Sequence, residues 1–140
     1  MKIFVTLSKK TLGIILSVLV ILIVLSGQIV SANLNKIDGS TNAKRMFFLK
    51  SIGIEANDSE STSKTVIIPK EFGEVYNSYN KLQKEAGFDL SKYKGKTATV
   101  YTYPINERYH AHIIVCDNSI IGGDIAALSV NGKMKPLVKN

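Results

Sequence analysis

The chain has 140 residues, a net charge of +7 and one cysteine. This length leaves room for one domain of roughly 100 residues besides a leader. The only cysteine, Cys116, excludes an intrachain disulfide, so packing alone must stabilise the domain. The positive charge is spread thinly, without the basic stripe and interleaved aromatic residues of a nucleic-acid interface, so we expect no nucleic-acid partner.

The N-terminal segment is a long apolar leader. Residues 11–35 carry no charge, and a helix over residues 12–30 would be about 28 Å long at ~1.5 Å per residue, close to a bilayer core of about 30 Å. Lys2, Lys9 and Lys10 precede this run, which places the N-terminus in the cytoplasm and the remainder outside. We therefore predict a single-pass helix with the membrane as its partner.

Residues 1–33 are either a retained signal anchor or a cleaved signal peptide. Val30-Ser31-Ala32 has the small residues that signal peptidase requires, and cleavage after Ala32 would release a secreted domain. We favour the anchor, followed by a linker at 34–42 and an extracytoplasmic domain at 43–138. Lysine far outnumbers arginine, and isoleucine and asparagine are frequent, as in AT-rich bacterial genomes, so we expect a bacterial cell membrane.

Two helices are expected in the first half of the domain. The shorter covers residues 40–52, with Ser40 or Thr41 as its cap and Gly53 at its end. A short strand at 64–68 then leads to Pro69, which suits the first position of a longer helix because it lacks an N–H. Apolar residues recur there at three- and four-residue steps until Gly87.

Beyond residue 96 the apolar period changes to two, which is typical of strands. Pro104 is expected to end the first strand, and Asp117-Asn118-Ser119 and Asn131-Gly132 supply turns. The predicted strands are 97–103, 109–116, 120–130 and 133–138. The fold class is therefore α+β: a small antiparallel sheet, a meander of three to four strands plus a short N-terminal strand, packed against one long and one shorter helix and preceded by a transmembrane helix.

His110 and His112 alternate on one strand face and are weak candidates for metal ligands. A metal site would need a third ligand, and only Glu107, Asp117 or Asp124 are close in sequence. We favour a solvated strand face and expect no metal, no other cofactor and no catalytic residue.

A better binding candidate is Gly122-Gly123-Asp124, since adjacent glycines in a strand indicate a bulge or a close approach of another group. Asp124 could bind a ligand, or it could equally bond freed backbone N–H groups. Tyr101 and Tyr103 share a face and, if exposed, would form an aromatic platform; otherwise they are cross-strand pairs that stabilise the sheet.

A long combined pattern resembles the bacterial domain of unknown function 4830 (DUF4830) family over about residues 43–137. Its pieces run from Ile67-Ile68-Pro69 through Tyr93-Lys94-Gly95-Lys96, and Tyr101-Thr102-Tyr103 and Ile120-Ile121-Gly122-Gly123-Asp124 follow. The resemblance implies a domain behind a leader or membrane segment, and it carries no activity. His110 and His112 are not part of the family pattern, whereas Gly122, Gly123 and Asp124 match it.

The sequence thus favours a non-enzymatic, membrane-tethered module that binds an envelope protein, a peptide or an anionic wall polymer. The alternative is a small exported metal-dependent or hydrolytic enzyme that uses His110, His112 and Asp124. A further alternative is an accessory subunit whose open sheet edge pairs with a partner strand.

Overall fold

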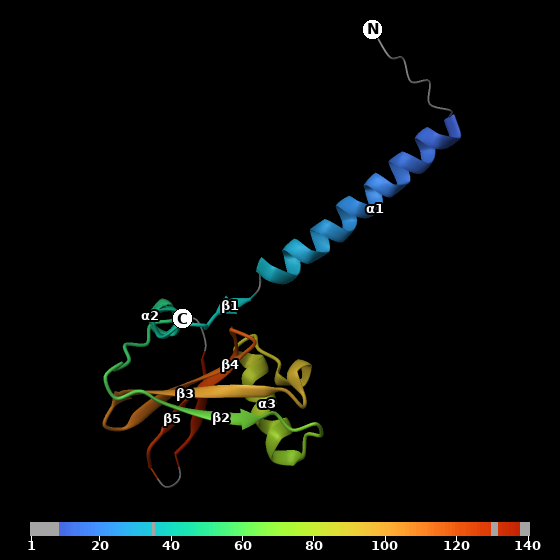
Figure 1. Cartoon of the computed structure of the whole chain (residues 1–140). Helices are drawn as coiled ribbons and strands as arrows, with labels where there is room; N and C mark the ends of the chain where they lie inside the picture. Colours follow the sequence, from blue (N-terminus) through green and yellow to red (C-terminus); the bar gives the residue numbers. More distant parts are fainter. Residues whose placement is uncertain (1–8, 35, 130–131, 138–140) are drawn as a thin grey trace. The chain divides into compact units, whose positions relative to one another are not determined.

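A computed structural model describes residues 9–34, 36–129 and 132–137, without the side chains of residues 9, 12 and 24–34. The chain divides into two units, one ending at Lys36 and the other beginning at Ile37. The first contains one helix, α1 (Lys9–Leu34), drawn in blue in Figure 1. Across the described residues, no helix has both the length and the apolarity to cross a membrane. Part of the span predicted at 12–30 lies outside the described side chains, and that span stays a prediction.

The second unit is an α+β domain with an antiparallel sheet, which confirms this part of the predicted fold class, whereas the transmembrane helix before it stays a prediction (Figure 1). The strands follow the order β1-β5-β4-β3-β2, and β6 also pairs with β5. They are β1 (Ile37–Asp38), β2 (Thr62–Ile67), β3 (Thr97–Asn106), β4 (Tyr109–Cys116), β5 (Ser119–Ala127) and β6 (Met134–Pro136). The helical elements are α2 (Asn42–Ser51), α3 (Glu74–Glu85) and a short 3-10 helix, η1 (Leu90–Tyr93).

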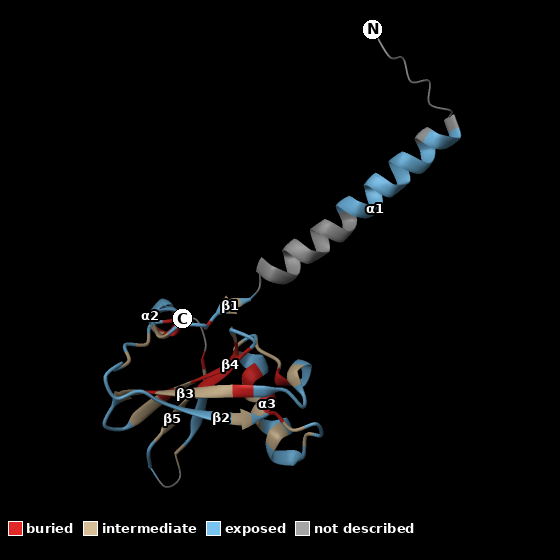
Figure 2. Cartoon of the chain, in the orientation of Figure 1, coloured by how far each residue is buried: buried red, intermediate tan, exposed pale blue. Residues whose placement is uncertain are grey.

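Side chains of the central strands alternate between two apolar clusters, and buried residues gather on these strands in Figure 2. One cluster joins the sheet to α2 through Phe48 and Leu49, and the other joins it to α3 through Tyr76 and Tyr79. Cys116 is free and belongs to the second cluster, as expected of a structural thiol. Burial raises the pKa of this thiol, which keeps it protonated.

The longer helix begins later than predicted. Pro69 was expected to open it, but the first helical residue is Glu74 and Gly73 is its N-cap. The chain is still paired along the sheet just before Pro69, because Ile68 N–H donates to Lys96 O at 2.9 Å. Residues 69–73 are therefore needed to turn the chain from the sheet into α3.

Pro104 does not end β3, which continues to Asn106. Pro104 lies opposite His110 of β4, whereas the pairing of β3 with β2 stops at Thr102. At Pro104, β3 therefore has a strand on one side only. Proline is tolerated at such an edge because the missing N–H breaks no ladder.

The ends of the domain differ from the prediction in smaller ways. The predicted linker at 34–42 contains β1, because Ile37 pairs with Ile120 of β5 and packs on the α2-side cluster. β5 ends at Ala127 rather than at residue 130, and β6 is shorter than the predicted 133–138. Residues 130, 131 and 138, including Asn131 of the predicted turn, lie outside the described residues.

The turn at Asp117 and Asn118 is confirmed, with φ of 49° and 62°.

Candidate binding site

Asp124 is the polar centre of the α3-covered face of the sheet. It lies directly opposite His112 in the pairing of β4 with β5, and Tyr79 reaches it from α3. The Tyr79 hydroxyl donates to Asp124 Oδ2 at 2.6 Å, and His112 Nδ1 lies 2.9 Å from Oδ1. With only 3% of its surface exposed, Asp124 is a buried carboxylate held between a phenol and an imidazole.

The charge of Asp124 fixes the state of its two partners. Burial first, and then the negative charge of Asp124, raise the pKa of Tyr79, so this phenol remains protonated and continues to donate. At this contact Asp124 Oδ1 accepts from the tautomer of His112 that carries its proton on Nδ1. The imidazole of His112 is therefore oriented, with Nε2 as its remaining polar atom and a quarter of the side chain exposed.

Gly122 and Gly123 are required by close packing, and β5 has the bulge that adjacent glycines predict. The pairing shifts by one residue between Ile120 and Gly122. Gln83 of α3 accepts the Gly123 N–H on Oε1 at 2.8 Å, and a Cβ on Gly122 would lie 2.7 Å from that oxygen. A Cβ on Gly123 would lie 2.2 Å from His112 O. These glycines let α3 and β4 approach β5 closely.

His110 lies apart from this centre. It lines a separate hollow together with acidic and apolar residues from the neighbouring loops, among them Glu60 and Glu107. No hydrogen bond or ion pair joins His110 to His112 or Asp124 in the described part of the chain. Among the described residues, no three His, Cys, Asp or Glu side chains are grouped so that they could hold a metal ion.

Tyr101 and Tyr103 face α2 and are engaged by Arg45. The guanidinium of Arg45 lies 3.5 Å from the centre of the Tyr101 ring, and its Nε donates to the Tyr103 hydroxyl at 2.8 Å. Tyr103 in turn donates to Asn42 Oδ1 at 2.7 Å and is fully buried. These two tyrosines thus hold α2 on the sheet, and Tyr103 offers no exposed surface to a ligand.

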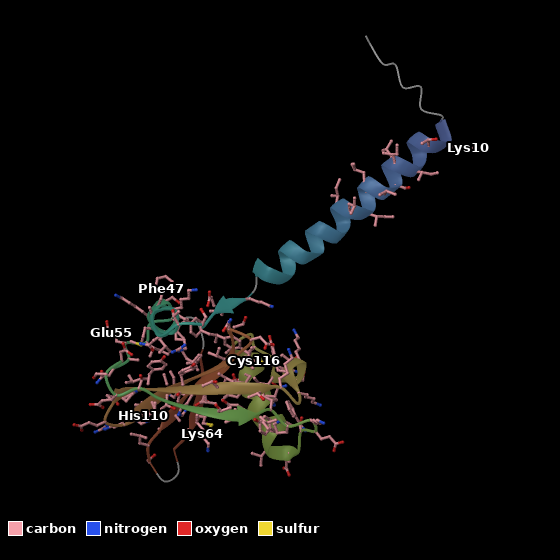
Figure 3. The ribbon with its side chains drawn as sticks, viewed as in Figure 1. Lys10, Phe47, Glu55, Lys64, His110 and Cys116 are labelled. Carbon is pink, nitrogen blue, oxygen red and sulfur yellow. The ribbon has the colours of Figure 1, made fainter. Side chains whose placement is uncertain are left out.

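An apolar hollow beside α2 was not anticipated from the sequence. It is a groove of about 650 Å³ beside α2, which we call the α2 groove. It is lined by Ile37, Asp38, Ala43, Lys44, Phe47, Phe48, Ser51, Ile52, Ala86, Phe88 and Leu137. Phe47 is 75% exposed on α2, where Figure 3 labels it, so the groove has a large unprotected aromatic ring at its side. Asp38 and Lys44 form an ion pair at 2.5 Å within the same lining.

The DUF4830 family model, described as a domain of unknown function, matches residues 48–125, which is more than half of the chain. This range is narrower than the 43–137 expected from the sequence, and it contains Tyr79, Gln83, His112 and Asp124. No curated protein and no solved structure matches the chain. The protein belongs to the DUF4830 family.

Proposed function

We propose that this protein is a non-enzymatic binding module of the bacterial envelope, tethered by its N-terminal segment and facing the cell exterior. The observation that carries the binding role is the α2 groove. Its volume of about 650 Å³ lies within the range of roughly 300–1,000 Å³ that is common for ligand pockets. Its lining is mostly apolar, with a few polar groups at Asp38, Lys44 and Ser51.

The tether is supported by the sequence of residues 12–30 and by the lysines that precede it. In this proposal the segment is retained as a single-pass anchor with a cytoplasmic N-terminus. Cleavage after Ala32 would instead release the same domain as a secreted protein. The binding role is the same in both cases.

The occupant proposed for the α2 groove is an apolar segment of an envelope protein or peptide. Aromatic side chains dominate the energetics of protein interfaces. Phe47 is more exposed than any other described aromatic residue in the lining, and the adjacent Phe48 is almost fully buried in the core. Phe47 is therefore available for contact with a partner, whereas Phe48 stabilises the core. An anionic wall polymer fits this apolar lining less well.

The test is a peptide selection on the full chain with two matched variants. Peptides selected from a displayed library are titrated against the wild type, Phe47→Ser and Val75→Ser, where Val75 is a similarly exposed apolar residue on α3. Loss of an aromatic contact worth about 1.5–3 kcal/mol weakens binding by roughly 10- to 100-fold in Phe47→Ser. Val75→Ser should bind as the wild type does. Equal affinities in all three proteins would refute the groove as the binding site.

A second candidate function, a small exported hydrolytic enzyme, is favoured by the 2.9 Å contact between His112 and Asp124. A carboxylate that orients an imidazole in this way is common in general-base catalysis. Hydrolysis of chromogenic esters by the wild type and His112→Gln decides this point. A rate that falls at least tenfold in His112→Gln would support an enzyme, and equal rates would end this candidate.

A further inference from the structure

β2 forms one edge of the sheet and is paired on one side only in the described part of the chain. Its partner is β3, along all six residues from Thr62 to Ile67. Five of these six residues are exposed, and β2 is pale blue along most of its length in Figure 2. An edge strand of this length presents unpaired backbone N–H and C=O groups to any second strand.

The hydrogen bonds of Ile68 show which residues of β2 point to the open side. Ile68 donates its N–H to Lys96 O at 2.9 Å and accepts from Gly95 N at 2.8 Å, so its peptide groups face the β3 side. In antiparallel pairing, successive residues alternate in this respect. Ser63, Thr65 and Ile67 therefore turn their backbone N–H and C=O groups away from β3.

These three residues are complementary to a second copy of themselves. With a two-fold axis at Thr65, Thr65 pairs with Thr65 of the second copy, and Ser63 pairs with Ile67 of the second copy. Every outward-facing residue then meets an outward-facing partner and exchanges both of its backbone hydrogen bonds. The exposed Ile67 side chain comes to lie beside Ser63 of the second copy.

Neighbouring registers are worse for reasons of charge and backbone chemistry. An axis at Lys64 would place two lysines directly opposite each other, which is destabilising. An axis at Val66 would place Ser63 opposite Pro69, which has no N–H to donate. In the Thr65-centred register, Lys64 instead lies opposite Val66 of the second copy. Lys64 thus blocks one incorrect register without blocking this one.

We propose that two copies of this chain pair through β2 in antiparallel orientation, with the two-fold axis at Thr65, and so extend one sheet across both domains. The surface that one short strand buries is small compared with the roughly 1,200–2,000 Å² of a stable complex. The dimer is therefore weak in free solution. It relies on the proposed membrane tether, which confines the copies and raises their effective concentration.

Single cysteines in full-length protein in membranes test the register. Directly opposed residues have Cα atoms about 5.5 Å apart, within disulfide range, so Thr65→Cys should link two copies on mild oxidation. Two copies of Ser63→Cys should not link to each other, because Ser63 of one copy and Ser63 of the other are offset by four residues along the paired strands, about 13 Å apart. Ser63→Cys co-expressed with Ile67→Cys should link. The wild type is the background control, because its only cysteine is buried.

Thr65→Pro and Thr65→Ala test the hydrogen bonds themselves. Proline removes the outward N–H at an edge position where the fold tolerates it, so energy transfer between labelled copies should fall on the order of tenfold. Thr65→Ala keeps the N–H and should retain the signal. Thr65→Cys copies that do not link, or Ser63→Cys copies that link as readily, would overturn the proposal. A linked band containing a different protein would also overturn it. If the proposed membrane tether is wrong, the chain will be absent from the membrane fraction, which distinguishes that outcome from failure of the dimer. The same cysteine variants can then be tested in concentrated solution.

Discussion

Replacement of Asp124 by alanine should destabilise the domain strongly, because this carboxylate joins α3 to the sheet. The substitution leaves the Tyr79 hydroxyl and the His112 Nδ1–H without their acceptor. Each unsatisfied buried group costs about 1–3 kcal/mol, and both are only partly exposed. We expect Asp124→Ala to lose about 3–4 kcal/mol of unfolding free energy and Tyr79→Phe to lose about 1.5 kcal/mol.

The double variant, Asp124→Ala with Tyr79→Phe, gives the coupling energy between the two side chains. If Tyr79 stabilises the domain through Asp124, then Tyr79→Phe should cost almost nothing once Asp124 is alanine, a coupling of about 1.5 kcal/mol. Urea unfolding of the full chain in nonionic detergent can be followed by near-ultraviolet circular dichroism of its six tyrosines. All six lie in the second unit, so α1 does not contribute to the signal. If the losses of unfolding free energy in the two single variants add up to the loss in the double variant within about 0.4 kcal/mol, this reasoning is refuted.

Three further changes test other parts of the fold by the same unfolding assay. Gly123→Ala should cost at least about 3 kcal/mol because its Cβ would lie 2.2 Å from His112 O; a loss below about 1 kcal/mol would contradict that packing. Arg45→Lys should cost about 2 kcal/mol of unfolding free energy, because a lysine ammonium cannot stack on the Tyr101 ring and donate to the Tyr103 hydroxyl at the same time. An unchanged unfolding midpoint would contradict this role. Hydrogen bonds, chiefly from Ser91, lower the pKa of Asp89 from 3.8 to about 2, so its stabilisation is complete above pH 3.8 and is lost as the pH falls towards about 2. Asp89→Ala should lack this loss, and an unchanged acid dependence would contradict the assignment.

Local sequence signals predicted those parts of the fold that depend on neighbouring residues. The change of period after residue 96 and the Asp117-Asn118 turn identify the meander, because strand alternation and positive φ are local properties. The adjacent glycines at 122 and 123 likewise indicated a bulge and a close approach. The start of α3 was missed because a proline suits a first helical turn but does not enforce one.

Contacts between distant elements could not be predicted in the same way. Tyr79 and Asp124 are 45 residues apart, and the helical pattern shows only that Tyr79 faces the core. Arg45 resembles a surface residue of an amphipathic helix, yet it lies buried over Tyr101 and Tyr103. The α2 groove draws its lining from β1, α2, the segment after α3 and the segment after β6, so no single stretch of sequence contains it.

The central claim is that α1 presents this domain outside the cytoplasm, and thiol labelling in intact cells tests it most directly. Lys94→Cys places a thiol at an exposed position of the domain, whereas the native Cys116 is buried. If the domain lies outside, a membrane-impermeant maleimide should label Lys94→Cys in intact cells as fully as it does after lysis. Labelling that occurs only after lysis would place the domain in the cytoplasm and contradict the proposed topology.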